Sequence, residues 1–301
     1  MLNSANFGRA RIPNSPSFVY NNYINYLRSP NKGNSVYINV YCRFRPLTEL
    51  EEEKENEKEE EQEESISIIS PTQIILFPDN KKDLKEDYIF DKLFDNKNSI
   101  EEIYNISSKQ LIYYTLNGYN SAIICYGQTG MGKTFTINEI VVEIGKQIFD
   151  EIDLIEDMNN LFKVEIGGFE IYKEQVSDLL DLININLELG ENKNKRIFVD
   201  NLTFFTVGDQ DEYSDVINKI LSKRNNSSLS MKEYTSRSNN IIVINIYRYT
   251  AAKKQLKSGC LYLVDLEGSE KITKNKIEGE SHEEKKILNK SLSTLRHLVQ
   301  T

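Results

Sequence analysis

The chain has 301 residues, of which 39% are hydrophobic and 28% are charged. This composition is typical of one large globular domain or two small ones, and it excludes a small disulfide scaffold, a fibre and a wholly disordered chain. The formal net charge is −9, but residues 51–64 hold ten glutamates against two lysines and supply −8 of it. The remainder is almost neutral, whereas nucleic-acid-binding proteins usually carry a basic surface. We therefore expect no nucleic-acid partner.

The three cysteines, Cys42, Cys125 and Cys260, lie far apart, and each sits inside or beside an apolar β-like run. That pattern indicates buried, reduced thiols in an intracellular protein rather than a disulfide framework or a zinc site. No stretch approaches the roughly 18 consecutive apolar residues of a membrane span, and residues 1–30 contain no secretory hydrophobic block. We expect a protein that does not insert into membranes.

The first segment, residues 1–35, contains no acidic residue and is rich in asparagine and serine. Its three arginines leave a transit segment as an alternative, but the composition is more typical of a disordered N-terminal arm. Folding is predicted to begin with a β-branched and aromatic strand over 36–42, which ends before Pro46. The glutamate-rich stretch 51–64 follows as a low-complexity insertion, which we interpret as a solvated loop because its like charges repel one another.

Strands and helices then alternate through the rest of the chain. Strands are expected over 65–69, 73–77, 122–126, 162–169, 241–249 and 261–264, and helices over 99–116, 133–152 and 287–299. This order predicts an α/β fold with a central, mostly parallel-type mixed sheet that is flanked by helices on both faces. We expect one folded domain over 36–301, with the acidic insertion inside it.

The strongest chemical motif lies between the predicted strand 122–126 and the predicted helix from residue 133. It reads G-Q-T-G-M-G-K-T and matches the phosphate-binding loop pattern G-x-x-x-x-G-K-[ST]. In such a loop, backbone N–H groups and a helix N-terminus converge on phosphates, the lysine supplies a charge, and the last hydroxyl binds Mg²⁺. A glycine-rich turn without a ligand is the alternative. The expected nucleotide-binding residues are Gly127, Gln128, Thr129, Gly130, Met131, Gly132, Lys133 and Thr134.

A phosphate site of this kind needs an acidic group on the Mg²⁺ side, commonly an aspartate at the end of a neighbouring apolar strand. Asp265 directly follows the apolar run 261–264. By itself, an aspartate in this position is more often a turn residue or a helix cap. The phosphate-binding loop reverses that preference, and the two motifs together predict a P-loop NTPase.

Several stretches resemble kinesin motor domains, in the order in which that family has them. The sequence D-L-E-G-S-E at 265–270 resembles the family's switch II motif, D-L-A-G-S-E. The other stretches are C-R-F-R-P-L at 42–47, Y-I-F-D-K-L-F at 88–94, F-E-I-Y at 169–172, D-L-L at 178–180 and L-N-K-S-L at 288–292. The resemblance runs from about residue 36 to residue 301 and is most similar to conventional kinesin heavy chain. It implies the kinesin motor fold and an ATPase that moves along microtubules in the cytoplasm.

The resemblance also implies how ATP and Mg²⁺ would be bound. The purine base would lie near Arg43, Arg45 and Pro46, with Phe135 as an aromatic face, since a guanidinium plane and a ring both stack on adenine. A solvated strand edge is the alternative for the two arginines. The implied Mg²⁺ ligands are Thr134, Ser236 and, through water, Asp265.

Catalytic roles follow from the same resemblance. Gly268 would sense the γ-phosphate through its backbone N–H, while Arg237 and Glu270 would close a salt bridge over the hydrolytic water. The implied catalytic set is Lys133, Ser236, Arg237, Asp265, Gly268 and Glu270.

The predicted helix 287–299 corresponds to the family's lever, which follows switch II and lies on the microtubule. Lysines near it become candidate contacts to the acidic tubulin surface, although a solvated lysine cluster is an equal alternative. These candidates are Lys271, Lys274, Lys276 and Lys290. In the family, a neck and coiled coil determine dimerisation, and we expect that dimerisation is not encoded in this chain.

Some positions depart from the family's pattern. Where switch I reads N-x-x-S-S-R-S-H, this chain has Lys232 and Asn239 in place of the asparagine and the histidine. Glu267 replaces a small residue; aimed at a phosphate from about 8 Å, it would cost about 2 kcal/mol at an effective dielectric constant of about 20. Aimed at solvent, it would cost little. The segment 136–143 is shorter than the family's loop there.

A catalytically impaired nucleotide- or tubulin-binding fragment is one alternative function, and an unrelated P-loop phosphotransferase is another.

The resemblance ends at Thr301, where the family continues into a last sheet strand and a last helix. In the family, that strand lies between the first strand and the strand before the phosphate-binding loop. Without it, we expect central N–H and C=O groups to stay unpaired or the sheet to re-pair, and the isolated chain to be poorly stable.

Overall fold

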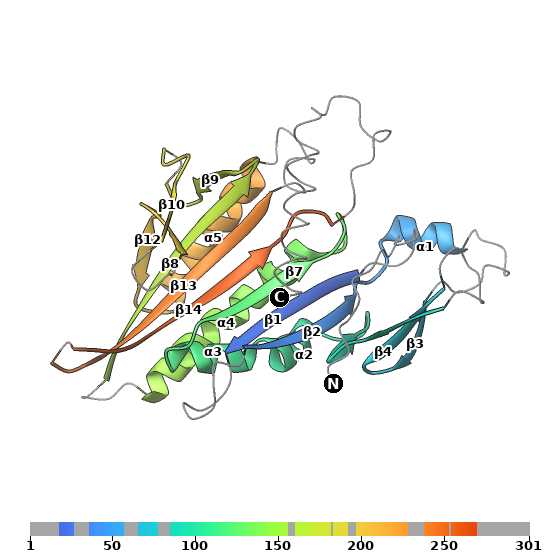
Figure 1. Ribbon diagram of the computed structural model, residues 1–301, viewed down its shortest axis with the longest axis horizontal. Helices are drawn as coiled ribbons and strands as arrows, with labels where there is room; N and C mark the ends of the chain where they lie inside the picture. Colours follow the sequence, from blue (N-terminus) through green and yellow to red (C-terminus); the bar gives the residue numbers. More distant parts are fainter. Residues whose placement is uncertain are drawn as a thin grey trace.

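The computed structural model describes residues 18–26, 36–56, 66–77, 85–155, 160–181, 183–191, 197–227, 238–252 and 254–269. Within these residues the main body is a nine-stranded sheet with helices packed on it (Figure 1). Strand β9 (Gln175–Asp178) pairs with β8 outside the main path. The path itself runs β12 (Phe204–Val207), β8 (Asn160–Tyr172), β13 (Asn239–Thr250), β14 (Gln255–Asp265), β7 (Ser121–Tyr126), β1 (Phe18–Tyr26), β2 (Val36–Phe44) and β6 (Lys92–Phe94).

The sheet is mixed, as predicted, but antiparallel pairs outnumber parallel ones among the described strands. Only β14–β7 and β2–β6 pair in parallel there. The long strands β13 and β14 follow each other directly in the chain and pair antiparallel, and β8 pairs antiparallel with β13 on the other side. Direct connections of this kind produce antiparallel neighbours, whereas parallel neighbours need a long crossover such as a helix.

Strand β1 corrects the prediction of a disordered arm for residues 18–26. It pairs antiparallel with β2 on one side and with β7 on the other. The position between the first matched strand and the strand before the phosphate-binding loop is therefore filled by a segment from the N-terminal part of this chain. The sheet thus re-pairs through β1, which is one of the two expected outcomes. The remaining residues of the arm, 1–17 and 27–35, lie outside the described residues.

Four helices cover one face of the sheet (Figure 1): α2 (Ile100–Ser107), α3 (Lys109–Leu116), α4 (Lys133–Ile155) and α5 (Gln210–Ser227). Helix α4 turns one apolar stripe to the sheet, because isoleucines recur at helical spacing at Ile137, Ile140, Ile144 and Ile148. These side chains pack with Ile123 and Leu263 and other inward-facing residues of the strands into the largest core. The expected cover on the opposite face rests on the predicted helix 287–299, which lies outside the described residues.

The predicted helix over 99–116 is two helices in the structure. A capping box begins α2, since the Ser99 side chain accepts a hydrogen bond from the backbone N–H of Glu102, and the Glu102 carboxylate accepts from that of Ser99. The break falls at Ser108, next to the Ser107 hydroxyl, which donates to the carbonyl of Ile103. Serine hydroxyls compete with the helical ladder in this way and favour helix ends. The predicted helix over 133–152 is confirmed as α4, which continues without a break across residues 136–143.

Smaller units flank this body. A separate sheet is formed by β3 (Ile66–Ser70), β4 (Gln73–Leu76) and β5 (Glu86–Ile89), and a two-stranded sheet by β10 (Leu189–Glu191) and β11 (Ile197–Val199). Helix α1 (Glu49–Asn56) occupies the start of the glutamate-rich stretch, which corrects the prediction of a loop there. Residues 57–65 of that stretch lie outside the described residues. No helix in the described part of the chain is long and apolar enough to span a membrane.

Candidate functional site

The candidate site lies at the edge of the sheet where β14, β7 and β2 end, with β1 between β7 and β2. Strands β7 and β14 are parallel neighbours, and Asp265 at the end of β14 pairs with Cys125 near the end of β7. The loop 127–132 then joins β7 to the start of α4. The phosphate-binding motif therefore has the strand–loop–helix context that the sequence predicts, and Asp265 lies beside it.

The loop depends on glycine at two positions. Gly130 and Gly132 have φ angles of 81° and 80°, a conformation that side-chain-bearing residues rarely adopt. A Cβ atom on Gly132 would also lie 3.3 Å from Nη1 of Arg43. The backbone of the loop can thus turn tightly into α4 and leave its N–H groups at the helix N-terminus, where they favour an anion.

Lys133 is bound to the loop by its own side chain. Its Nζ donates to the carbonyl oxygens of Gly127 and Gln128, each at 2.8 Å, and the residue is 7% exposed. A buried ammonium needs such acceptors, because transfer out of water without them is costly. The contacts hold a positive charge at the position where the phosphate-binding pattern requires one.

Thr134 and Asp265 lie together on the side of the loop where a metal ion is expected. The Thr134 hydroxyl donates to Oδ2 of Asp265 at 2.6 Å, and Asp265 is 2% exposed. A hydroxyl and a carboxylate are the hard oxygen donors that Mg²⁺ prefers, and Mg²⁺ usually completes its shell with water and phosphate oxygens. The pair fits such an ion. Within the described ranges no group of three or more His, Cys, Asp or Glu residues is placed to hold a metal on its own.

Arg43 lies between the phosphate-binding loop and an aromatic ring. Its guanidinium lies 5.3 Å from the centroid of the Phe135 ring, and Nη1 donates to the Thr136 hydroxyl at 3.3 Å. Thr136 in turn donates to the carbonyl of Gly132 at 2.8 Å. Burial lowers the pKa of Arg43, and the nearby charge of Arg45 lowers it further. The half-exposed Phe135 ring thus has a buried cation against one face.

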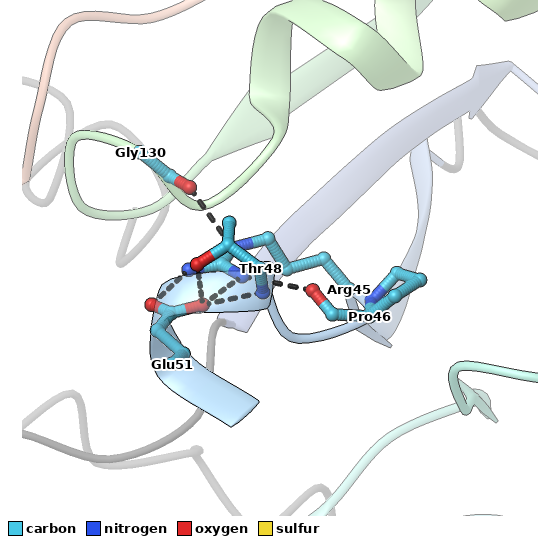
Figure 2. Close-up of polar contacts among 5 residues, drawn as sticks. All are labelled: Arg45, Pro46, Thr48, Glu51 and Gly130. Carbon is cyan, nitrogen blue, oxygen red and sulfur yellow. Dashed lines mark hydrogen bonds and ion pairs between the residues drawn. The ribbon is translucent and has the colours of Figure 1, made fainter. Parts of the chain in front are cut away.

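Arg45 bridges the phosphate-binding loop and helix α1 (Figure 2). Its Nε donates to the carbonyl of Gly130 at 3.0 Å, and both terminal nitrogens bind the carboxylate of Glu51, at 2.7 and 2.6 Å. Glu51 also accepts from the backbone N–H of Thr48 at 2.9 Å. The Arg45 hydrogen bonds, with the one from Thr48, lower the pKa of Glu51 from 4.5 to about 2. This bidentate contact fixes the orientation of the Arg45 side chain.

The segment after β14 continues along the phosphate-binding loop. The backbone N–H of Leu266 donates to the carbonyl of Cys125 at 3.2 Å, and that of Ser269 to the carbonyl of Gly127 at 3.1 Å. Gly268 lies between these two contacts. Asn239 accepts from the backbone N–H of Glu267 at 3.0 Å, so the residue that replaces the family's histidine links β13 to this segment. Glu267 is 4% exposed, and its side chain is therefore not turned to solvent.

The structure brings most of the predicted site residues together. The residues predicted to contact the base, Arg43, Arg45, Pro46 and Phe135, lie with the loop 127–134, Asp265 and Gly268 around one end of the sheet. The remaining predicted site residues lie outside the described residues: Ser236, Arg237, Glu270, Lys271, Lys274, Lys276 and Lys290. Lys232, a departure from the family's pattern, lies outside them as well.

Two residues of the site were missed by the sequence analysis. Thr136 has no motif of its own, and only the fold brings it to Arg43. Glu51 does have a signal, because Thr48-x-x-Glu51 matches the capping box pattern that opens a helix. The surrounding glutamate run concealed it, since we interpreted the whole run as low-complexity.

Comparison with known proteins gives consistent results. A model of the kinesin motor domain family matches residues 43–301. The chain is 34% identical to the kinesin heavy chain of Drosophila melanogaster over 276 residues and 35% identical to the kinesin-1 heavy chain of Homo sapiens over 271 residues. Each match covers 87% of this chain but only 27% of the relative's length.

Solved structures show the same likeness. The structure of a fast kinesin has a TM-score of 0.74 and 33% sequence identity, and the match covers 84% of this chain and 72% of that one. The C-terminal motor and motor homology domain of Kar3Vik1, fused to a synthetic heterodimeric coiled coil, has a TM-score of 0.69 and 28% identity. That match covers 85% of this chain and 67% of the other.

Proposed function

Because the chain belongs to the kinesin motor domain family, we propose that it binds Mg-ATP at the loop 127–134, hydrolyses it and couples the hydrolysis to movement along microtubules. The observation that carries the proposal is the placement of Lys133 and of the Thr134–Asp265 pair at one phosphate-binding loop, with the hydroxyl and carboxylate 2.6 Å apart. This membership leaves no support for the alternative of an unrelated P-loop phosphotransferase.

The proposed roles follow from the donors that each residue offers. The loop N–H groups and Lys133 bind the phosphates, Thr134 and Asp265 hold the metal, and Arg43 and Phe135 contact the base together with Arg45 and Pro46. Mg-ATP supplies the phosphoryl group to be transferred and the cation that offsets its charge. The chain's own task is to hold these groups in line with a water molecule, because such catalysis is mainly positioning and charge stabilisation.

The remaining roles belong to the two switches. Gly268 would report the γ-phosphate through its N–H, Ser236 would add a metal ligand, and Arg237 and Glu270 would close over the hydrolytic water. Movement of these segments would reach the predicted helix 287–299, and the nearby lysines would contact tubulin. We propose a location in the cytoplasm on microtubules.

The experiment is to measure ATP turnover by the full chain with and without microtubules. We expect turnover to rise when microtubules are added, and Lys133→Ala to abolish turnover because it removes the phosphate-binding charge. Glu139→Gln is the matched control, since Glu139 lies exposed on the same helix α4. No rise in turnover with the unaltered chain would contradict the motor function.

A second candidate is a domain that binds nucleotide or tubulin without useful turnover. The buried carboxylate of Glu267 favours it, because a second acidic group close to the phosphate-binding loop opposes a bound polyphosphate. A single-turnover measurement separates the two functions. Release of the γ-phosphate as inorganic phosphate supports the motor, whereas recovery of intact ATP supports the binding domain.

A further inference from the structure

Strand β1 joins two parts of the main sheet that no other described strand connects. On one side lie β12, β8, β13, β14 and β7, and on the other lie β2 and β6. All nine residues of β1 pair with β2, and Tyr20–Asn25 also pair with β7. If β1 left this position, β2 and β7 would each present unpaired backbone groups in the middle of the sheet, and such edges bind extended chains readily.

The two strands beside β1 are more apolar than β1 itself. On β2, Tyr41 and Cys42 are buried, and on β7, Ile123 and Cys125 are fully buried. Three of the nine residues of β1 are asparagines: Asn21 lies in register between Tyr41 and Cys125, and Asn22 between Val40 and Ile124. Asparagine is depleted in strands, so three asparagines among nine residues lower the strand propensity of β1. The occupant is thus a weaker match to this position than an apolar strand would be.

One end of β1 lies next to the candidate site. Val19 pairs with Arg43, and Asn21 pairs with Cys125 on the other side. Two residues beyond Arg43 lies Arg45, and two residues beyond Cys125 begins the phosphate-binding loop. Strand β1 therefore fixes the base side of the site to its phosphate side through one continuous ladder of hydrogen bonds.

We propose that the space between β2 and β7 is a strand-binding site, that the segment Phe18–Tyr26 of this chain binds it reversibly, and that its binding controls nucleotide affinity. The ligand is an extended segment that runs antiparallel to both neighbours. Because β1 precedes every other described element, it can leave without any of them having to unthread. The control of affinity rests on the proposed function, whereas reversible binding of the strand does not.

The position of β1 is tested by cross-linking to native cysteines. Tyr20 pairs with Cys42, and Asn21 pairs with Cys125. Opposite residues of antiparallel strands have Cα atoms about 4.5–5.5 Å apart, which is within the range of a disulfide. We expect Tyr20→Cys to cross-link to Cys42, and Asn21→Cys to Cys125, on oxidation with oxidised glutathione. Ile24→Cys is the control, because it pairs with Ile38 and Ala122 and should not cross-link.

Peptide mapping by mass spectrometry reads out the linked residues. The two expected links within one polypeptide support the proposal. Links only between two polypeptides would overturn it, because the occupant would then belong to a second copy. Equal yields at all three positions would overturn it as well, since they would indicate an unpaired, freely moving segment.

Reversible binding is tested with the variant Asn22→Pro, which removes a backbone N–H from a strand that is paired on both sides. Cys42 and Cys125 are fully buried beside β1, whereas Cys260 lies on β14 and serves as the internal control. We expect alkylation of Cys42 and Cys125 by N-ethylmaleimide to become at least about tenfold faster, with no change at Cys260. A synthetic peptide of residues 16–28 should restore the protection.

Each outcome of this labelling decides the proposal. An unchanged rate at Cys42 and Cys125, an equal increase at all three cysteines, or a failure of the peptide to protect would each overturn reversible binding. On the same variant, titration with a fluorescent ATP analogue should show an affinity lowered about tenfold and restored by the peptide. If the unaltered chain binds no ATP analogue, the proposed function fails while the labelling result stands.

Discussion

At the scale of single residues, the contact between Arg45 and Glu51 shows how a charge in an acidic run acquires a defined role. The carboxylate binds both terminal nitrogens of Arg45, and the pKa of Glu51 is lowered to about 2. Since the folded pKa lies below the ordinary value of 4.5, the contact stabilises the folded chain above about pH 4.5. That stabilisation is lost as the pH falls from 4.5 towards 2.

Glu51→Gln should therefore lower the free energy of unfolding at neutral pH and have little effect near pH 2. The Glu51 side chain is 42% exposed, so solvent screens the pair and the effect should be about 1 kcal/mol or less. Urea unfolding between pH 7 and pH 3 measures the difference between the variant and the unaltered chain. Glu52→Gln, which removes an exposed charge from the same helix, is the control. A difference that does not shrink at low pH contradicts the assignment.

Glu267 leads to a second prediction at this scale. Glu267 is buried in the segment whose neighbours Leu266 and Ser269 donate to Cys125 and Gly127, so an ionised Glu267 carboxylate that faced a bound nucleotide would oppose its phosphates. An opposing charge of this kind costs about 2 kcal/mol at about 8 Å and an effective dielectric constant of about 20. We expect Glu267→Gln to tighten binding of an ATP analogue by up to about thirtyfold, as measured by fluorescence titration, with Glu139→Gln unchanged. Equal affinity in both variants would mean that the Glu267 carboxylate does not face the phosphates.

At the scale of elements, helices α4 and α5 meet at a glycine. A Cβ atom on Gly145 would lie only 2.4 Å from Cε1 of Tyr213, whose hydroxyl donates to the carbonyl of Val141 at 2.9 Å. Tyr213 is 1% exposed and cannot move into solvent without losing that hydrogen bond. The glycine is therefore what allows the tyrosine of α5 to lie flat against α4.

We expect Gly145→Ala to destabilise the chain by about 1–3 kcal/mol, because overpacking outweighs the better helix propensity of alanine. Chemical denaturation measures the loss. Gly208→Ala is the control, since the nearest atom to its Cβ would be an oxygen of Glu212 at 3.6 Å. A stabilised Gly145→Ala variant would show that the two helices separate easily at this point.

At the scale of the whole molecule, the main sheet is continuous only through β1 among the described strands. The reason for expecting a poorly stable chain was a set of unpaired groups in the middle of the sheet, and that reason does not apply while β1 occupies the position between β2 and β7. The stability of the isolated chain itself stays a prediction for measurement.

Thermal unfolding of the full chain tests how far the sheet depends on β1. We expect Asn22→Pro to cost about 1–3 kcal/mol through a lost ladder hydrogen bond and to lower the midpoint by several degrees. Glu139→Gln, an exposed change on α4, should leave the midpoint unchanged. Identical midpoints for the two variants would indicate that β1 contributes nothing to the stability of the sheet.

The sequence by itself determined the phosphate-binding loop, its strand and helix, and the kinship with kinesin motor domains, because these depend on short runs of residues with fixed spacing. It determined α4 as well, since an apolar stripe at helical spacing is a local pattern. Only the tertiary structure decided that β1 fills the middle of the sheet, because its aromatic and β-branched residues are interrupted by three asparagines and nothing local in the sequence selects β2 and β7 as its partners. The same holds for the contacts of Arg43 with Thr136 and of Arg45 with Gly130, in which residues from separate elements meet only after the sheet has brought β2 beside the phosphate-binding loop.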